Sequence, residues 1–375
     1  MEFNNIETCD NEQVNSNSEE ISTNQWRLKC FQKRKSIWIV ISIVLLILII
    51  IIPIIIIKTK KNDVKQMSTT EETRPKYKKY GQQGITVAGG NGEGDELNQL
   101  FYPGNIIIDE NKAILIADNR NHRIVKWKYG SNNGEIIAGG DRTGDENDQL
   151  RYPIDMIDDK ENDALIIFES GKNRIVRWFR KNQTYHEILV VGFFPIHLAM
   201  DKNGFIYVCD PENHEVRRWK DGDTTRGIIV AGGNGKGNQL NQLNDPGCIF
   251  IDDDYTLYVS DWGNNRVMKW MKGAKEGFIA AGGNGDGNNL NQLTFPAGLI
   301  VDHLGHIYVA DMENHRVMRW CEGDADGSIV VGGNGEGEKS NQLNSPTRLS
   351  FDDDGDLYVV DEYNHRIQKF EIFYD

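Results

Sequence analysis

A repeat of about 50 residues constrains the fold of this chain more than any other feature. Each copy contains a hairpin such as IYVADMENHRVMRW at 307–320, in which an apolar strand, an acidic turn with Asn and a second strand follow one another. Asp and Asn favour such turns because their short side chains bond nearby backbone groups. A proline opens each copy, at intervals of 50, 42, 51, 50 and 50 residues: Pro103, Pro153, Pro195, Pro246, Pro296 and Pro346. This period, with about four short strands per unit, predicts a β-propeller.

The copies also predict the number of blades and how the ring closes. Four strands are expected in each copy, as at 296–302, 306–311, 315–320 and 328–333. Residues 85–90 resemble a fourth strand without the first three, and the chain ends after three strands that lack a fourth. We therefore expect an all-β, six-bladed propeller whose last blade is closed by the N-terminal strand.

The hairpin turns carry a more specific motif. Asn-His-Arg stands at 121–123, 314–316 and 364–366, each time three residues after an acidic residue. In this pattern residues 81–375 resemble the NHL-repeat family of propellers. The resemblance implies the fold but no single activity, since similar propellers act as ligand-binding, RNA-binding and enzymatic modules. Other copies lack the full motif, so we interpret the His as a turn or packing residue.

An apolar run before the propeller predicts a membrane anchor. Residues 37–57 are uncharged and almost wholly aliphatic, and a helix of that length spans the ~30 Å hydrocarbon core. We expect a single transmembrane helix at 36–57, a disordered tail at 1–35 and a polar stalk at 58–80. A cleaved signal peptide is the alternative, but the apolar run is too long and no small-residue cleavage site follows.

The orientation of this single-pass anchor does not follow from charge, because basic residues flank both ends of the span. The short N-terminal tail and one glycosylation sequon at Asn182 favour a type II protein with an extracellular or lumenal propeller. That orientation makes it a membrane glycoprotein.

Charge disfavours nucleic acid as a partner. Residues 81–375 contain 29 Lys and Arg against 47 Asp and Glu, a formal charge of −18. Such a domain repels a phosphate backbone unless a local basic stripe overrides the net charge. The Gly-rich loops, such as GGNGEGD from residue 89, lie between two strands. Since a dinucleotide fingerprint needs a following helix, these loops predict turns and no nucleotide site.

The second residue after each proline differs from copy to copy, and this variation points to a site. In similar repeats this position is typically Gly, and a structural position would tend to repeat. The first strand of a propeller blade is innermost, so these side chains should surround the mouth of the channel on the face of the Gly-rich loops. The residues are Asn105, Asp155, His197, Cys248, Gly298 and Arg348.

These residues favour a binding module for a protein or small-molecule ligand at that face. The first alternative is a metal-assisted lyase or hydrolase that acts through Asp155, His197 and Arg348. Zinc or calcium would be its metal, but one His in the ring is fewer ligands than such a site ordinarily has. The acidic run at 352–355 could suggest calcium, and a solvated hairpin turn is the simpler interpretation. The second alternative is a propeller that only spaces or oligomerises other parts.

Overall fold

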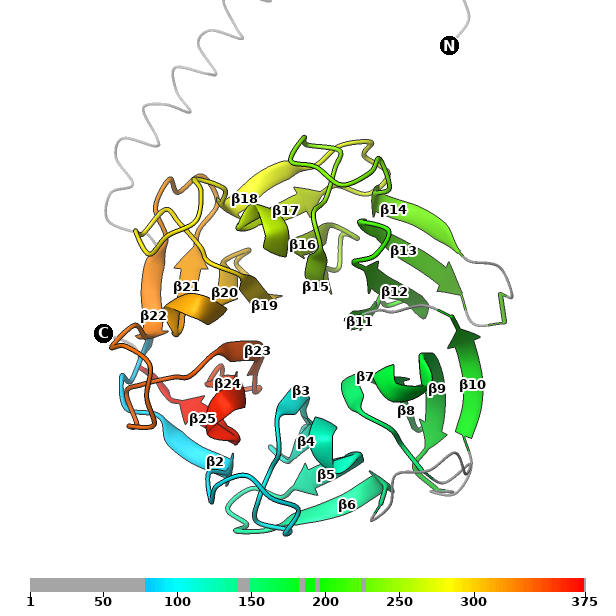
Figure 1. The fold of residues 1–375 in the computed structure, drawn as a ribbon, viewed down its shortest axis with the longest axis vertical. Helices are drawn as coiled ribbons and strands as arrows, with labels where there is room; N and C mark the ends of the chain where they lie inside the picture. Colours follow the sequence, from blue (N-terminus) through cyan, green and yellow to red (C-terminus); the bar gives the residue numbers. More distant parts are fainter. Residues whose placement is uncertain are drawn as a thin grey trace, which may run out of the picture. The chain divides into compact units, whose positions relative to one another are not determined.

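The computed structural model describes residues 78–140, 149–181, 186–192, 196–220, 222–223 and 227–373. These residues belong to one compact unit that begins at Lys78. Six four-stranded antiparallel sheets surround a central axis, so the predicted six-bladed all-β propeller is confirmed (Figure 1).

Each blade is a meander whose first strand is innermost (Figure 1). Blade 1 contains β3 (Pro103–Ile108), β4 (Ile114–Asp118), β5 (Arg123–Trp127) and β6 (Gly134–Gly139); blade 2 contains β7 (Pro153–Asp159), β8 (Ala164–Glu169), β9 (Arg174–Phe179) and β10 (His186–Val191). Blade 3 contains β11 (His197–Met200), β12 (Phe205–Asp210), β13 (Glu215–Lys220) and β14 (Ile228–Gly232); blade 4 contains β15 (Pro246–Ile251), β16 (Leu257–Asp261), β17 (Arg266–Trp270) and β18 (Phe278–Gly282). Blade 5 contains β19 (Pro296–Val301), β20 (Ile307–Asp311), β21 (Arg316–Trp320) and β22 (Ser328–Gly332).

Blade 6 joins the two ends of the chain. It contains β23 (Pro346–Phe351), β24 (Leu357–Asp361), β25 (Arg366–Phe370) and, as its outermost strand, β2 (Ile85–Gly89). In this antiparallel pair Ile85 lies opposite Lys369 and Gly89 lies opposite Arg366. The predicted closure by the N-terminal strand is therefore confirmed.

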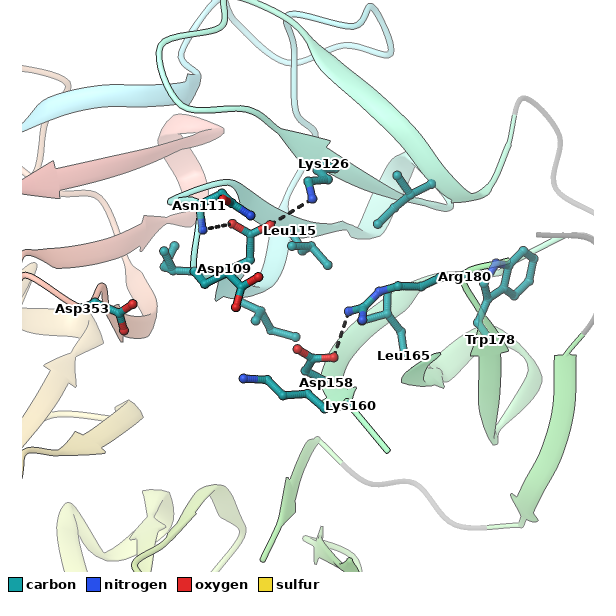
Figure 2. Close-up of a pocket in the computed structure, with 14 residues that line it drawn as sticks. Asp109, Asn111, Leu115, Lys126, Asp158, Lys160, Leu165, Trp178, Arg180 and Asp353 are labelled. Carbon is teal, nitrogen blue, oxygen red and sulfur yellow. Dashed lines mark hydrogen bonds and ion pairs between the residues drawn. The ribbon is translucent and has the colours of Figure 1, made fainter. Parts of the chain in front are cut away.

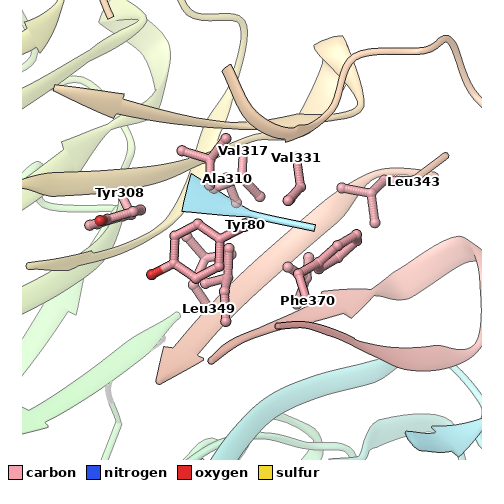
Figure 3. Close-up of a cluster of buried hydrophobic side chains, with 11 residues drawn as sticks. Tyr80, Tyr308, Ala310, Val317, Val331, Leu343, Leu349 and Phe370 are labelled. Carbon is pink, nitrogen blue, oxygen red and sulfur yellow. The ribbon is translucent and has the colours of Figure 1, made fainter. Parts of the chain in front are cut away.

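A second pairing of the chain ends was not expected from the sequence. The short strand β1 (Lys79–Tyr80) pairs with β26 (Ile372–Phe373). Tyr80 is 3% exposed and packs with Tyr308, Leu349 and Phe370 between blades 5 and 6 (Figure 3). Its hydroxyl donates to the carbonyl of Gly355 at 3.2 Å. The folded unit thus begins three residues before the expected boundary at residue 81.

The remaining N-terminal predictions lie outside the described residues. These are the tail at 1–35, the membrane helix at 36–57, the stalk up to residue 77 and, further along, the sequon at Asn182. Within the part of the chain that the structure describes, no helix has both the length and the apolarity needed to cross a bilayer.

The core is divided into six clusters that lie mostly between neighbouring blades. The aromatic residue at or next to the end of each third strand is almost fully buried: Trp127, Trp178, Trp219, Trp270, Trp320 and Phe370. Burial of such large side chains supplies most of the driving force for folding, because it scales with the apolar area removed from water.

The repeated acidic residue holds the turn at the inner edge of each Gly-rich loop. In blade 5, Asp311 is fully buried and accepts from Arg316 Nε at 2.7 Å, from Asn314 Nδ2 and from the backbone N–H of Thr294 at 2.7 Å. Arg316 also donates to the carbonyls of Asn288, Asn289 and Gln292 in the loop. We call this Asp–Asn–Arg group the clamp, and it explains why these residue types recur.

Blade 3 departs from the clamp in two ways at once. The long Gly-rich loop before it is absent, since only residues 192–196 connect β10 to β11. The clamp Arg is replaced by Glu215, and among the described residues Asp210 accepts from the backbone N–H and the side-chain amide of Asn213. The Arg is thus lost in the copy that has no long loop to hold.

The motif His connects neighbouring blades, which confirms its interpretation as a packing residue. His315 has a left-handed backbone and its Nδ1 accepts from the backbone N–H of Ser345 in the next blade at 3.1 Å. In blade 4 the corresponding Asn265 accepts from the N–H of Phe295 at 3.0 Å through Oδ1. Asn tolerates the left-handed conformation and supplies an equivalent acceptor.

The two ends of the propeller are named here by their loops. The loop face carries the Gly-rich loops and the Asn-His turns, and the turn face carries the turns between first and second strands. On the turn face, Asp352 accepts from the backbone N–H groups of Asp354 and Asp356 at 3.1 and 2.9 Å. Lys112 pairs with both Asp352 and Asp354. The acidic run therefore forms a hydrogen-bonded turn with a basic partner.

Candidate ligand-binding channel

The variable residues predicted from the repeat lie on the six innermost strands. They come from β3, β7, β11, β15, β19 and β23, and these strands contact one another around the axis (Figure 1). We call these residues the ring: Asn105, Asp155, His197, Cys248, Gly298 and Arg348. Most of the ring is buried, with exposed fractions of 0% for Asp155, 1% for Cys248, 6% for Arg348 and 8% for Asn105.

Asp155 joins three blades. Its Oδ1 accepts from Asn105 Nδ2 of blade 1, and its Oδ2 accepts from the backbone N–H of Leu198 in blade 3. His197 Nε2 lies 4.0 Å from the same Oδ2. Burial raises the pKa of this carboxyl from its ordinary 3.8 to about 6, although the Arg348 charge opposes the shift.

His197 is held as a neutral imidazole. Its Nδ1 accepts from the backbone N–H of Ile249 in blade 4 at 3.4 Å, so the ring proton belongs on Nε2. Burial, and then the positive charge of Arg348, lower the pKa of His197 well below its ordinary value. The Nε2–H group therefore remains a donor without a hydrogen-bond acceptor among the described residues.

Arg348 reaches across the channel. It comes from blade 6, and its Nη2 donates to the carbonyl of Ile196, just before β11 of blade 3, at 3.2 Å. Nη1 donates to the carbonyl of Thr347 at 3.0 Å. The buried Nε has no acceptor, and no described carboxylate lies within 4.0 Å of the guanidinium. Arg348 thus links blade 6 to blade 3 across the axis of the propeller.

Two ring positions have simpler roles. Burial raises the pKa of the Cys248 thiol, so it is a poor nucleophile and a small packing group. At Gly298 a Cβ atom would lie 2.4 Å from the carbonyl oxygen of Thr347, so no side chain fits there. Gly298 is therefore constrained by close packing of β19 against β23.

A cavity of about 260 Å³ lies in the channel against the ring. Asn105, His197, Cys248 and Arg348 line it, together with apolar residues further along the same strands: Ile107, Ile157, Ala199, Phe250 and Ile300. These strands run from the loop face to the turn face, so the cavity extends from the ring toward the turn face. The sequence predicted a site at the channel mouth on the loop face, which stays a prediction, and this cavity lies on the other side of the ring.

A larger cavity of about 760 Å³ lies between blades 1 and 2 on the turn face (Figure 2). Its floor is apolar, with Leu115, Leu165 and Trp178, and its rim carries the pairs Lys126–Asp109 at 2.9 Å and Arg180–Asp158 at 2.8 Å. It shares Ile107 and Asp158 with the channel cavity, so the two adjoin. The sequence analysis missed this groove, which arises where two blades meet and has no repeat signal.

The possible metal ligands of the ring are few and already bonded. Among the described residues, no group of three or more His, Cys, Asp or Glu is arranged to hold a metal ion. Asp155 already accepts hydrogen bonds from Asn105 and from the backbone of Leu198, and His197 Nδ1 accepts one from the backbone of Ile249. His197 and Arg348, which line the cavity, each have a donor without an acceptor among the described residues.

Comparison with known proteins identifies the repeat. The NHL repeat model matches residues 293–319 and 343–370, which cover blade 5 and blade 6 hairpins. No curated protein matches the sequence. Solved structures share the fold at low identity. An auxiliary nutrient binding protein from Bacteroides thetaiotaomicron has a TM-score of 0.59 and 14% identity, with 79% of this chain and 77% of the other covered.

Two enzymes also share the fold. A gluconolactonase from Xanthomonas campestris has a TM-score of 0.53 and 15% identity, with 80% of this chain and 99% of the other covered. A virginiamycin B lyase from Staphylococcus aureus has a TM-score of 0.50 and 14% identity, with 79% and 100% covered. At these identities the likeness concerns the fold alone. The NHL repeat match in blades 5 and 6 and the six-bladed architecture together support an NHL-repeat type of β-propeller.

Proposed function

We propose that this propeller is a binding module that takes a small molecule in its central channel. One observation carries the proposal: a cavity of about 260 Å³ is lined by ring residues that differ from blade to blade. A purely structural channel would repeat its lining, as the clamp and the closing aromatic residues do. Likeness in fold to an auxiliary nutrient binding protein is consistent with this function.

Filling the cavity tests the proposal. Ala199 is a half-buried residue on β11 that lines the cavity, so Ala199→Phe should occupy the space without removing a polar group. The matched control is Ala280→Phe on the outer strand β18, also half-buried but remote from the channel. Ligand-observed NMR with a fragment library should find compounds that bind the wild type and the control but not Ala199→Phe. Equal binding to all three proteins would refute a channel site.

An enzyme is the second candidate, favoured by one observation. Asp155 has a pKa raised to about 6 and lies beside His197, and such pairs can exchange protons with a substrate. Two related folds belong to a gluconolactonase and a virginiamycin B lyase. Metal analysis and turnover assays separate the candidates. Stoichiometric zinc or calcium that is lost in His197→Ala, together with turnover, would favour the enzyme over the binding module.

We also propose that residues 37–57 anchor the propeller to a membrane with the propeller on the extracellular or lumenal side. The uninterrupted apolar run supports an anchor, and the sequon at Asn182 supports this orientation. Glycosidase sensitivity that disappears in Asn182→Gln is the expected result. A membrane-impermeant reagent could instead label the propeller lysines as soon as the plasma membrane alone is opened, with the organelle membranes intact. That result would place the propeller in the cytosol and reverse the proposed orientation.

A spacer that only oligomerises is the remaining alternative. It requires self-association of the propeller, which light scattering measures directly. A monomer that still binds fragments in the channel is the outcome that the binding function predicts.

A further inference from the structure

The most unusual group in the channel is a buried positive charge that makes no ion pair. Arg348 is 6% exposed, and no described carboxylate lies within 4.0 Å of it. By contrast, the mostly buried Arg side chains of the clamps lie at hydrogen-bond distance from a carboxylate, as Arg316 does from Asp311. An isolated charge of this kind is unfavourable in a protein interior unless something compensates it.

We infer that the channel ligand is a small organic monoanion, with its acidic group at Arg348 and His197 and its apolar body along the cavity wall. This inference rests on the proposed binding function and names the class of ligand. Planar guanidinium groups favour carboxylates and related oxyanions, since their N–H groups match the spacing of the two oxygens.

Two donors support an anionic group at this end of the cavity. Among the described residues, the buried Nε of Arg348 has no acceptor and the Nε2–H group of His197 has none within hydrogen-bond distance. Both residues line the same cavity. An oxyanion between them would satisfy two donors at once, and a ligand that only donates hydrogen bonds would satisfy neither.

The nearby carboxyl groups of Asp155 and Glu362 offset the charge of Arg348 only by long-range electrostatic attraction, without an ion pair. Asp155 and Glu362 both feel its charge, and burial nevertheless raises the pKa of Asp155 to about 6 and of Glu362 to about 7. Both oxygens of Asp155 already accept hydrogen bonds from other groups. Neither carboxyl group therefore accepts a hydrogen bond from Arg348, whose bonds go to the backbone carbonyls of Thr347 and Ile196.

The rest of the lining specifies one charge and an apolar body. Asp158 is the acidic residue among those that line the cavity, and it is paired with Arg180 at 2.8 Å. The walls are formed by Ile107, Ile157, Ala199, Phe250 and Ile300. One cation beside an aliphatic and aromatic wall suits a monocarboxylate or monosulfonate, and it is poorly suited to phosphate, which carries more charge and no apolar part.

Isothermal titration of the purified full-length chain tests the inference with benzoate, benzenesulfonate and the neutral isostere benzamide. We expect benzoate and benzenesulfonate to bind at least tenfold more tightly than benzamide and inorganic phosphate. Arg348→Gln should remove that preference, and Lys272→Gln, at an exposed lysine of blade 4, should retain it. Circular dichroism verifies that Arg348→Gln, which loses its bonds across the channel, still folds.

A second measurement avoids the variants altogether. In ¹⁵N-histidine NMR of the wild type, benzoate should shift the Nε2–H signal of His197 and leave that of His315, which connects two blades, unchanged. Equal affinity for benzamide and benzoate, or no shift of the His197 signal at saturation, would refute the organic anion. In that case fragments that still lose binding in Ala199→Phe would leave the proposed binding function standing.

Discussion

The clamp and the ring occupy the same blades, yet they vary in opposite ways. The Asp of the clamp satisfies two side chains and a backbone group within its own blade and loop, as Asp311 does, so each copy has the same requirement. Ring residues contact other blades, and each one has different neighbours. Asp155 meets blades 1 and 3, and Arg348 reaches blade 3 from blade 6. Repetition in a propeller therefore marks contacts that are local to the repeat, and variation marks the axis where the copies meet.

The largest expected effect comes from breaking a clamp. Asp311→Ala leaves the buried guanidinium of Arg316 without its carboxylate and the N–H of Thr294 without an acceptor. We expect a loss of about 3–5 kcal/mol in the free energy of unfolding. Asp210→Ala in blade 3, which has no clamp Arg, should cost only about 1 kcal/mol. Urea denaturation measures both, and equal losses would contradict the assignment of the clamp.

A ring position that packing constrains should also be sensitive. Gly298→Ala places a Cβ atom 2.4 Å from the backbone oxygen of Thr347, so β19 and β23 must separate. The expected loss is about 1–3 kcal/mol. As control, Gly92→Ala removes a glycine whose Cβ would meet nothing within 4 Å but whose φ is +78°, so its cost measures backbone strain alone. A neutral Gly298→Ala would show that the inner strands are less tightly packed than described.

Titration of the ring should change the charge around Arg348. As pH falls through about 7 and then about 6, Glu362 and Asp155 each take up a proton, while burial keeps the pKa of His197 low and that of the Cys248 thiol high. The surroundings of Arg348 thus lose negative charge as pH falls. Affinity for benzenesulfonate, which remains ionised, should rise about tenfold between pH 7.5 and 5. Asp155→Asn should make that rise smaller and leave the part due to Glu362, and a profile unchanged in Asp155→Asn would assign the whole titration to another group.

The same shift affects stability with a definite sign. Because burial raises the pKa of Asp155 from 3.8 to about 6, the folded state retains a proton that the unfolded chain has lost in this interval. The contribution of Asp155 to stability therefore falls as pH rises through about 4 to 6. Thermal unfolding should be measured at about pH 4 and about pH 6 for the wild type and for Asp155→Asn. The loss of stability between the two pH values should be smaller for Asp155→Asn than for the wild type.

The smallest expected effect comes from exchanging the residue that connects two blades. His315→Asn introduces the residue already present as Asn265 in blade 4, where it makes the same kind of bond. The change in the free energy of unfolding should be below about 0.5 kcal/mol, whereas His315→Ala should cost about 1–3 kcal/mol because it leaves the N–H of Ser345 without an acceptor. Thermal denaturation distinguishes them, and a large effect of His315→Asn would give the His a role beyond packing.

The sequence predicted features that depend on the repeat. The proline interval gave the number of blades, the incomplete end copies gave the closure by β2, and unequal copies located the ring. It did not predict that the cavity lies on the turn-face side, because the bond between Arg348 and Ile196 joins residues 152 positions apart. Nor did it predict the burial of Tyr80, which follows a charged segment and owes its position to blades 5 and 6. Such contacts depend on distances that only the closed ring sets.

The shared sixth blade has a consequence for synthesis. Its outermost strand, β2, emerges from the ribosome before any other strand of a blade, while its partner β25 emerges last among the blade strands. Until then the apolar side chains of β2 and Tyr80 have no place to pack, and such unpaired edges are prone to aggregation during translation. The wheel can close only after β25 has been synthesised, so a nascent chain stalled within blade 6 leaves β2 without its partner strand and available to a chaperone.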